Sequence, residues 1–78
     1  MQIDKARRVR DLAQEVVRLI DAATARAHRD REATNAYWTE RGETPLTDPP
    51  DIAYSPESSA LRRRSMDLTR ALAEMRKP

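Results

Sequence analysis

The first 41 residues contain neither glycine nor proline, and this feature most limits what the chain can fold into. Alanine, arginine, glutamate and leucine, which favour helices, are frequent in this segment. We therefore predict a long helix over residues 4–41, which at 1.5 Å per residue would be about 55 Å long. Asp4 is expected to cap its start, and Gly42 is expected to end it in the left-handed conformation.

The apolar residues of this segment recur at helical spacing. Placed at 100° per residue, they form one stripe about 120° wide, which is typical of an amphipathic helix. The members of the stripe are Val9, Leu12, Ala13, Val16, Leu19, Ile20, Ala23, Ala27, Thr34, Tyr37 and Trp38. Its most hydrophobic part lies in the N-terminal half, and its small alanines would allow close approach of another helix.

Residues 43–55 break the helical pattern, because their prolines remove amide donors and favour extended conformations in the preceding residues. We predict an elbow that is longer than the usual connection of about 2 to 8 residues between helices. A proline-rich docking peptide is the alternative interpretation. The apolar residues expected to pin the elbow against Tyr37 and Trp38 are Leu46, Ile52 and Tyr54.

A second helix is predicted over residues 56–76. Ser55, Pro56 and Glu57 form a helix-start signature, with a capping hydroxyl, a preset φ angle and a negative charge in the first turn. The apolar positions of this helix form a narrow stripe that consists of Leu61, Leu68, Leu72 and Met75.

The expected fold is therefore all-α, a single helical-hairpin domain over residues 1–78. If the chain folds directly back, the shorter helix covers the longer one from Ala23 to Trp38. The residues expected in this hairpin contact are Ala23, Ala27, Tyr37, Trp38, Leu61, Leu68, Leu72 and Met75.

The part of the stripe expected to stay uncovered comprises Val9, Leu12, Val16, Leu19 and Ile20. An exposed apolar patch usually marks an interface, so we expect a homodimer that forms a four-helix or coiled-coil-like bundle, and another protein as a further partner.

The charges leave nucleic-acid binding open as an alternative function. The net charge is only +2, but both chain ends are basic and the segment between them is acidic. The residues that would contact phosphates are Arg7, Arg8, Arg62, Arg63 and Arg70. Against this, the arginines of the triplet 62–64 point in three directions on a helix. In addition, Arg63 and Arg70 each precede an acidic residue by four positions, and Arg64 precedes Asp67 by three, which are the spacings of helical ion pairs.

Few residues suit catalysis or metal binding. The chain has no cysteine, one glycine and a single histidine, His28, which stands four residues before Glu32 and is expected to be an exposed, ion-paired side chain. We expect no cofactor, no metal and no enzymatic activity.

No apolar stretch is long enough to span a membrane, so a cytoplasmic protein is expected. The arginine and alanine bias is typical of a GC-rich bacterium or its phage. These features favour an adaptor, an inhibitor or an assembly component.

Overall fold

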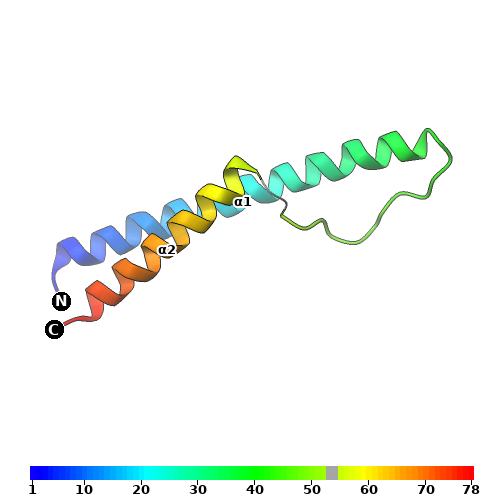
Figure 1. The fold of residues 1–78 in the computed structure, drawn as a ribbon. Helices are drawn as coiled ribbons and strands as arrows, with labels where there is room; N and C mark the ends of the chain where they lie inside the picture. Colours follow the sequence, from blue (N-terminus) through cyan, green and yellow to red (C-terminus); the bar gives the residue numbers. More distant parts are fainter. Residues whose placement is uncertain (53–54) are drawn as a thin grey trace.

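A computed structural model describes residues 1–52 and 55–78, which form two helices joined by an elbow (Figure 1). The helices are α1 (Ile3–Thr39) and α2 (Pro56–Arg76), and no strand occurs within these two ranges. The molecule measures 62 × 19 × 13 Å and has a radius of gyration of 17.9 Å. A compact chain of this length would have a radius of about 11–12 Å. The predicted all-α helical hairpin is confirmed, and it is a rod.

The two ends of α1 are determined by different local features. Its N-cap is Gln2, which forms no side-chain capping hydrogen bond, so the prediction that Asp4 caps the helix is wrong and Asp4 lies in the first turn. At the other end the Glu43 amide donates to the Trp38 carbonyl at 3.0 Å. Gly42 has a φ of +83°, which allows this closure and confirms its expected left-handed conformation.

The start of α2 follows its sequence signature. The Ser58 amide donates to the Ser55 hydroxyl at 3.1 Å, and the Ser55 amide donates to the Ser58 hydroxyl at 2.9 Å. Pro56 occupies the first helical position, where no amide donor is needed. The predicted bounds and cap of this helix are therefore confirmed, with a serine in the reciprocal position of the capping box.

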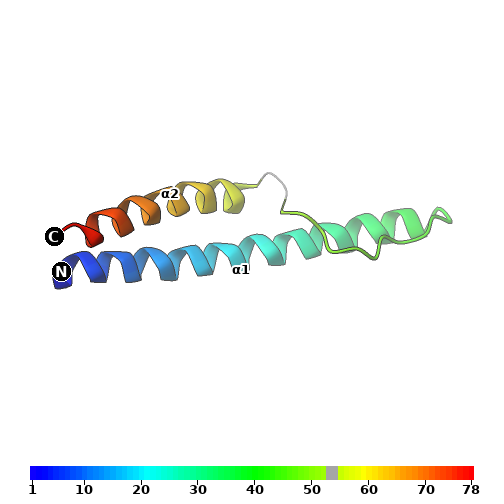
Figure 2. The same cartoon turned by 90° about the horizontal axis from the view of Figure 1, so that it is seen from below.

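The chain reverses direction tightly at the end of α1, and the elbow then runs back along the C-terminal half of this helix (Figure 2). The Asn35 amide group donates to the Leu46 carbonyl and accepts from the Leu46 amide, both at 3.0 Å. One turn earlier in α1, Arg31 donates to the Asp48 carbonyl at 2.6 Å. Two polar side chains of α1 therefore fix the path of the returning backbone.

The elbow was predicted to be pinned against Tyr37 and Trp38 by apolar side chains, but its described apolar residues are largely exposed. The exposed fractions of Leu46 and Ile52 are 55% and 44%. Tyr54, the third residue expected to pin the elbow, lies outside the described residues. Within the described part of the elbow, hydrogen bonds to backbone groups hold the segment more than apolar burial does.

This path places α2 beside the N-terminal half of α1, so that the two chain ends lie together (Figures 1 and 2). The helices are antiparallel. Their register is marked by three ion pairs, Arg26–Glu57 at 3.1 Å, Glu15–Arg64 at 3.3 Å and Lys5–Glu74 at 3.7 Å.

The prediction of which half α2 covers is therefore wrong. Leu12 and Leu19, expected to be uncovered, are buried with exposed fractions of 7% and 5%. Tyr37 and Trp38, expected beneath α2, are 49% and 47% exposed. The reason is the elbow. It returns along α1 from the end of that helix to the level of Arg26, a distance of about 20 Å at 1.5 Å per residue, before α2 begins.

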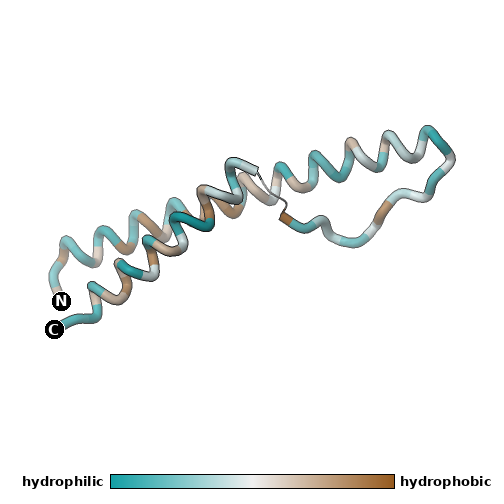
Figure 3. The backbone as a smooth tube through the Cα atoms, in the orientation of Figure 1, coloured by the Kyte–Doolittle hydropathy of each residue, from teal (hydrophilic) through white to brown (hydrophobic). Residues whose placement is uncertain are grey.

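The contact between the helices is thin. Strongly hydrophobic segments occur where the two helices run side by side and also at positions in the elbow (Figure 3). The buried residues are Leu12, Leu19, Ala23, Ala27 and Ala71, three of which are alanines. The apolar residues of the predicted α2 stripe are only half-buried, namely Leu61, Leu68, Leu72 and Met75. A core of this size gives a marginally stable monomer.

We predict that Leu19→Ala lowers the free energy of unfolding by about 2 to 5 kcal/mol, because it removes one of the two buried leucines. Urea unfolding followed by far-UV circular dichroism measures this change. Met66→Ala is the matched control, since Met66 is 52% exposed and its loss should leave the midpoint nearly unchanged. Equal midpoints for the two variants would contradict the described contact.

Candidate interface

The apolar arc of α1 is wider than the part that α2 covers. Leu12 and Leu19 face α2, whereas Val9, Val16 and Ile20 lie roughly 50 to 90° further round the helix. Val9 and Val16 are half-buried, and Ile20 is 42% exposed. This flank therefore remains open after the hairpin has formed.

No charged residue lies on this flank of α1 between residues 2 and 27, although 36% of the whole chain is charged. At 100° per residue, a sector of about 100° beside the α2 contact contains Gln2, Ala6, Val9, Ala13, Val16, Val17, Ile20, Thr24 and Ala27. Val17, at the outer edge, is 57% exposed. A solvated helix surface in so charged a chain would be expected to carry charges, so this flank is unusual.

The second helix presents a similar flank, made of Leu61, Ser65, Leu68 and Leu72. The three leucines are half-buried, and the first charged residue in line with them is Arg76. Because the two right-handed helices are antiparallel, their open apolar flanks emerge on the same side of the hairpin. We call this side the uncharged face, consisting of Val9, Ala13, Val16 and Ile20 of α1 with Leu61, Ser65, Leu68 and Leu72 of α2.

The residues of the uncharged face follow the spacing of a helix-packing seam. In α1 the steps from Val9 to Ile20 are four, three and four residues, and those from Leu61 to Leu72 in α2 are the same. Alternating steps of three and four keep residues on one seam of a coiled coil or helix bundle. Each helix therefore has one seam for its partner within the chain and a second, adjacent seam that the chain leaves open.

The opposite face of the hairpin carries the ion pairs between the helices. Arg64 lies between Glu15 and Asp67, at 3.3 Å from a carboxylate oxygen of each. Lys5 and Glu74 complete this side near the chain ends. The charged face and the uncharged face therefore lie on opposite sides of the contact between the helices.

The predicted pairing of the α2 arginines is only partly observed. Asp67 pairs with Arg64 and not with Arg63, and Glu74 pairs with Lys5 and Lys77 and not with Arg70. The cause is the packing of α1, which brings Lys5 to Glu74 and holds Arg64 between two carboxylates. Within residues 1–52 and 55–78, Arg63 and Arg70 form no ion pair.

The fold brings the basic residues of both chain ends to one end of the rod. Residues 1–18 and 61–78 together contain eleven basic and five acidic residues, a net charge of +6. Residues 19–60, which form the other end, contain four basic and eight acidic residues, a net charge of −4. The exposed arginines at the basic end that form no ion pair with described residues include Arg7, Arg8, Arg62, Arg63 and Arg70.

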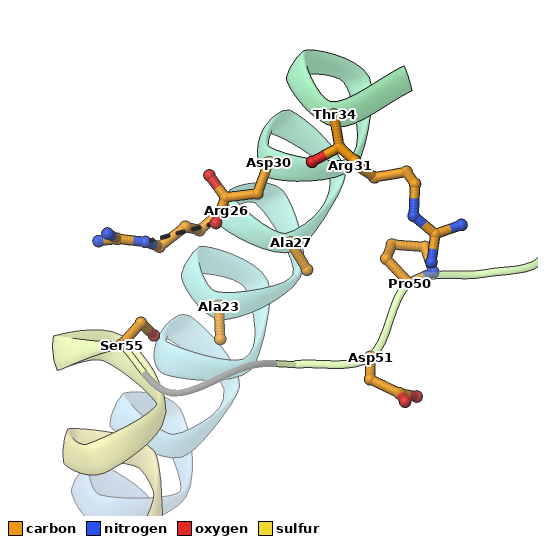
Figure 4. A pocket seen from close by; sticks show the side chains of 9 residues that line it. All are labelled: Ala23, Arg26, Ala27, Asp30, Arg31, Thr34, Pro50, Asp51 and Ser55. Carbon is orange, nitrogen blue, oxygen red and sulfur yellow. Dashed lines mark ion pairs between the residues drawn. The ribbon is translucent and has the colours of Figure 1, made fainter. Parts of the chain in front are cut away.

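A notch of about 200 Å³ lies where α2 begins, between α1 and the elbow (Figure 4). Ala23 and Ala27 line it from α1. Arg26 on its rim pairs with Glu57 at 3.1 Å and with Asp30 at 3.9 Å. The small apolar side chains of this notch and its paired charges suit the packing of a side chain better than a catalytic role.

The aromatic residues form a separate cluster at the far end of the rod. The rings of Tyr37 and Trp38 pack edge to face with centroids 5.1 Å apart. The Arg41 guanidinium lies 3.5 Å from the centre of the Tyr37 ring, a cation–π contact that the sequence pattern did not indicate. This half-exposed cluster lies beyond the region that α2 reaches.

Other kinds of site lack the necessary groups. His28 is exposed as expected, but it forms no ion pair with Glu32, and the described part of the chain contains no cluster of three residues able to hold a metal ion. Neither α1 nor α2 contains a stretch apolar enough to cross a bilayer. Comparisons with protein-family models, curated proteins and solved structures found no match to this chain.

We predict that the hairpin loses stability as the pH falls below about 4.5, the ordinary pKa of glutamate. A backbone hydrogen bond at the start of α2 and the Arg26 guanidinium lower the pKa of Glu57, and Lys77 and then Lys5 lower that of Glu74. The stabilisation that these two carboxylates provide is complete above the ordinary pKa and disappears as the pH falls through the lowered value.

Thermal unfolding of the wild type and of Glu57→Gln at several pH values measures this loss of stability. The variant should show a smaller loss on acidification, and identical profiles would contradict the role of Glu57.

Proposed function

We propose that this protein is a non-enzymatic helical interaction module that self-associates through its uncharged face. The observation that carries the proposal is the pair of adjacent, charge-free apolar seams on one side of the hairpin. Two such faces packed together would form a four-helix arrangement in which each helix contacts two neighbours. The interface first expected on α1 alone is thus revised, because Leu12 and Leu19 contribute to the monomer core and the leucines of α2 join the open side.

The energetics of a short chain support this proposal. The hairpin buries few large side chains, and small helical chains commonly gain stability by oligomerisation. Half-buried leucines and valines on one face would become fully buried in a dimer. At roughly 25 cal/mol per Å² of apolar area, completing their burial adds stabilisation that the single hairpin lacks. Such a module could act as an adaptor, an inhibitor or an assembly component.

We expect Ile20→Asp to produce a helical monomer, because it places a charge within the proposed interface without entering the hairpin core. Light scattering at micromolar concentration, combined with far-UV circular dichroism, measures mass and helicity together. Met66→Asp is the matched control, since Met66 is exposed on the far side of α2 and its replacement should leave the assembly intact. A wild-type protein that is a folded monomer would overturn the proposal. Acidic substitutions at Leu12 or Leu19 would unfold the hairpin and are not suitable tests.

The basic end of the rod favours a second candidate function, binding of a nucleic acid or another polyanion. The antiparallel fold brings Arg8 of α1 and Arg70 of α2 to one groove, which Lys5 also lines. Neither arginine forms an ion pair with a described residue. However, Asp67 and Glu74 line the same groove, so the surface is not uniformly basic. Clustered cations without partners are the usual requirement for contact with phosphates.

If the second candidate is correct, Arg8→Gln combined with Arg70→Gln should weaken binding to DNA or RNA at low ionic strength, whatever the base sequence. Fluorescence anisotropy with a labelled oligonucleotide at several salt concentrations measures both the affinity and its salt dependence. Arg29→Gln removes an exposed arginine from the acidic half and serves as control. Absence of binding by the wild type at low salt would end this candidate.

A further inference from the structure

We propose that the two copies pair in opposite directions, so that the basic end of one rod lies against the acidic half of the other. This inference rests on the proposed self-association and adds its direction. Two observations support it, namely the register of the apolar residues on the uncharged face and the separation of charge along the rod.

The ion pairs that set the hairpin register also place the apolar residues in common layers. The residue numbers of the paired positions add up to about 80, so Val9 lies level with Leu72 and Ile20 lies level with Leu61. The centre of the α1 seam and the centre of the α2 seam therefore lie at the same height along the rod. A two-fold axis across the uncharged face at this height would stack α1 on α1 and α2 on α2.

In this arrangement Val9 of one copy lies opposite Ile20 of the other, and Leu61 lies opposite Leu72. All neighbouring helices are antiparallel, as in many four-helix bundles. A parallel pair of hairpins, with the two-fold axis along the rod, would place Val9 opposite Leu72 and Ile20 opposite Leu61. The apolar packing does not distinguish the two arrangements, because in both of them the residues that lie opposite each other are apolar.

The charges distinguish the two arrangements. In a parallel dimer the two ends with net charge +6 would lie side by side, as would the two regions with net charge −4. In the antiparallel dimer residues 1–8 and 70–78 of one copy instead lie level with residues 21–28 and 55–63 of the other, which contain two acidic and three basic residues. Residues 29–54 of that copy, with six acidic and three basic residues, begin directly beyond this level. Each basic end therefore lies next to the acidic region of the partner and away from the partner's own basic end. Opposite charge patterns on facing surfaces determine the direction of pairing.

Single-cysteine variants can test this direction, because the chain contains no cysteine of its own. Val9→Cys is mixed with Ile20→Cys in one sample and with Leu72→Cys in another, one partner of each mixture carrying a mass tag. After exchange of subunits and mild oxidation, electrophoresis without reductant measures the mixed disulfide. We expect the mixture of Val9→Cys with Ile20→Cys to give at least several times more mixed disulfide. A dominant product from Val9→Cys with Leu72→Cys would overturn the antiparallel arrangement.

The salt dependence of association gives an independent measurement. Attraction between opposite ends weakens when ions screen it, so the dissociation constant of the wild-type dimer should rise with sodium chloride between low and physiological ionic strength. Association that becomes tighter with salt would indicate facing like charges and would overturn the inference. A folded monomer in light scattering, with no mixed disulfide in either sample, would instead overturn the self-association itself. The failures of the two proposals are therefore distinguishable.

Discussion

The architecture of this protein depends on a polar clamp between α1 and the elbow. The side-chain amide of Asn35 pairs with both backbone groups of Leu46, much as a neighbouring strand would. Arg31, one turn before Asn35 in α1, donates a hydrogen bond to the Asp48 carbonyl further along the elbow. Because the backbone is held against α1 over this distance, α2 cannot begin until the chain has returned to the level of Arg26. The clamp therefore decides which half of α1 becomes core and which half extends beyond the hairpin.

Local signals in the sequence were sufficient to predict the helices. The absence of glycine and proline before Gly42 and the Ser55–Pro56 start gave bounds within two residues of those observed. The register of the hairpin could not be predicted in the same way. It depends on hydrogen bonds from Asn35 and Arg31 to backbone groups far along the chain, and no apolar pattern indicates such contacts. An elbow held by hydrophobic pinning near Trp38 was the simpler expectation, and it led to the wrong covered half.

The residues of the uncharged face could be predicted only in part, because the direction from which α2 approaches α1 was not predicted. The α1 stripe identified Val9, Val16 and Ile20, which remain on the open flank whichever half α2 covers. It could not separate them from Leu12 and Leu19, because only the direction of approach of α2 divides a wide stripe into a covered edge and an open one. Similarly, the contact of Arg64 with Glu15 could not be predicted, because it requires the observed register.

The distribution of side-chain size between the two seams links folding to association. Alanines fill much of the contact between α1 and α2, which lets the helices approach closely but buries little apolar area. Larger valine, isoleucine and leucine side chains lie on the uncharged face, while ion pairs between exposed groups, which contribute little each, bridge the opposite side. The hairpin thus places much of its larger apolar surface on a side that its own two helices do not cover. In such a molecule a partner that covers this face stabilises the folded chain by mass action, so stability and assembly become one equilibrium that depends on protein concentration.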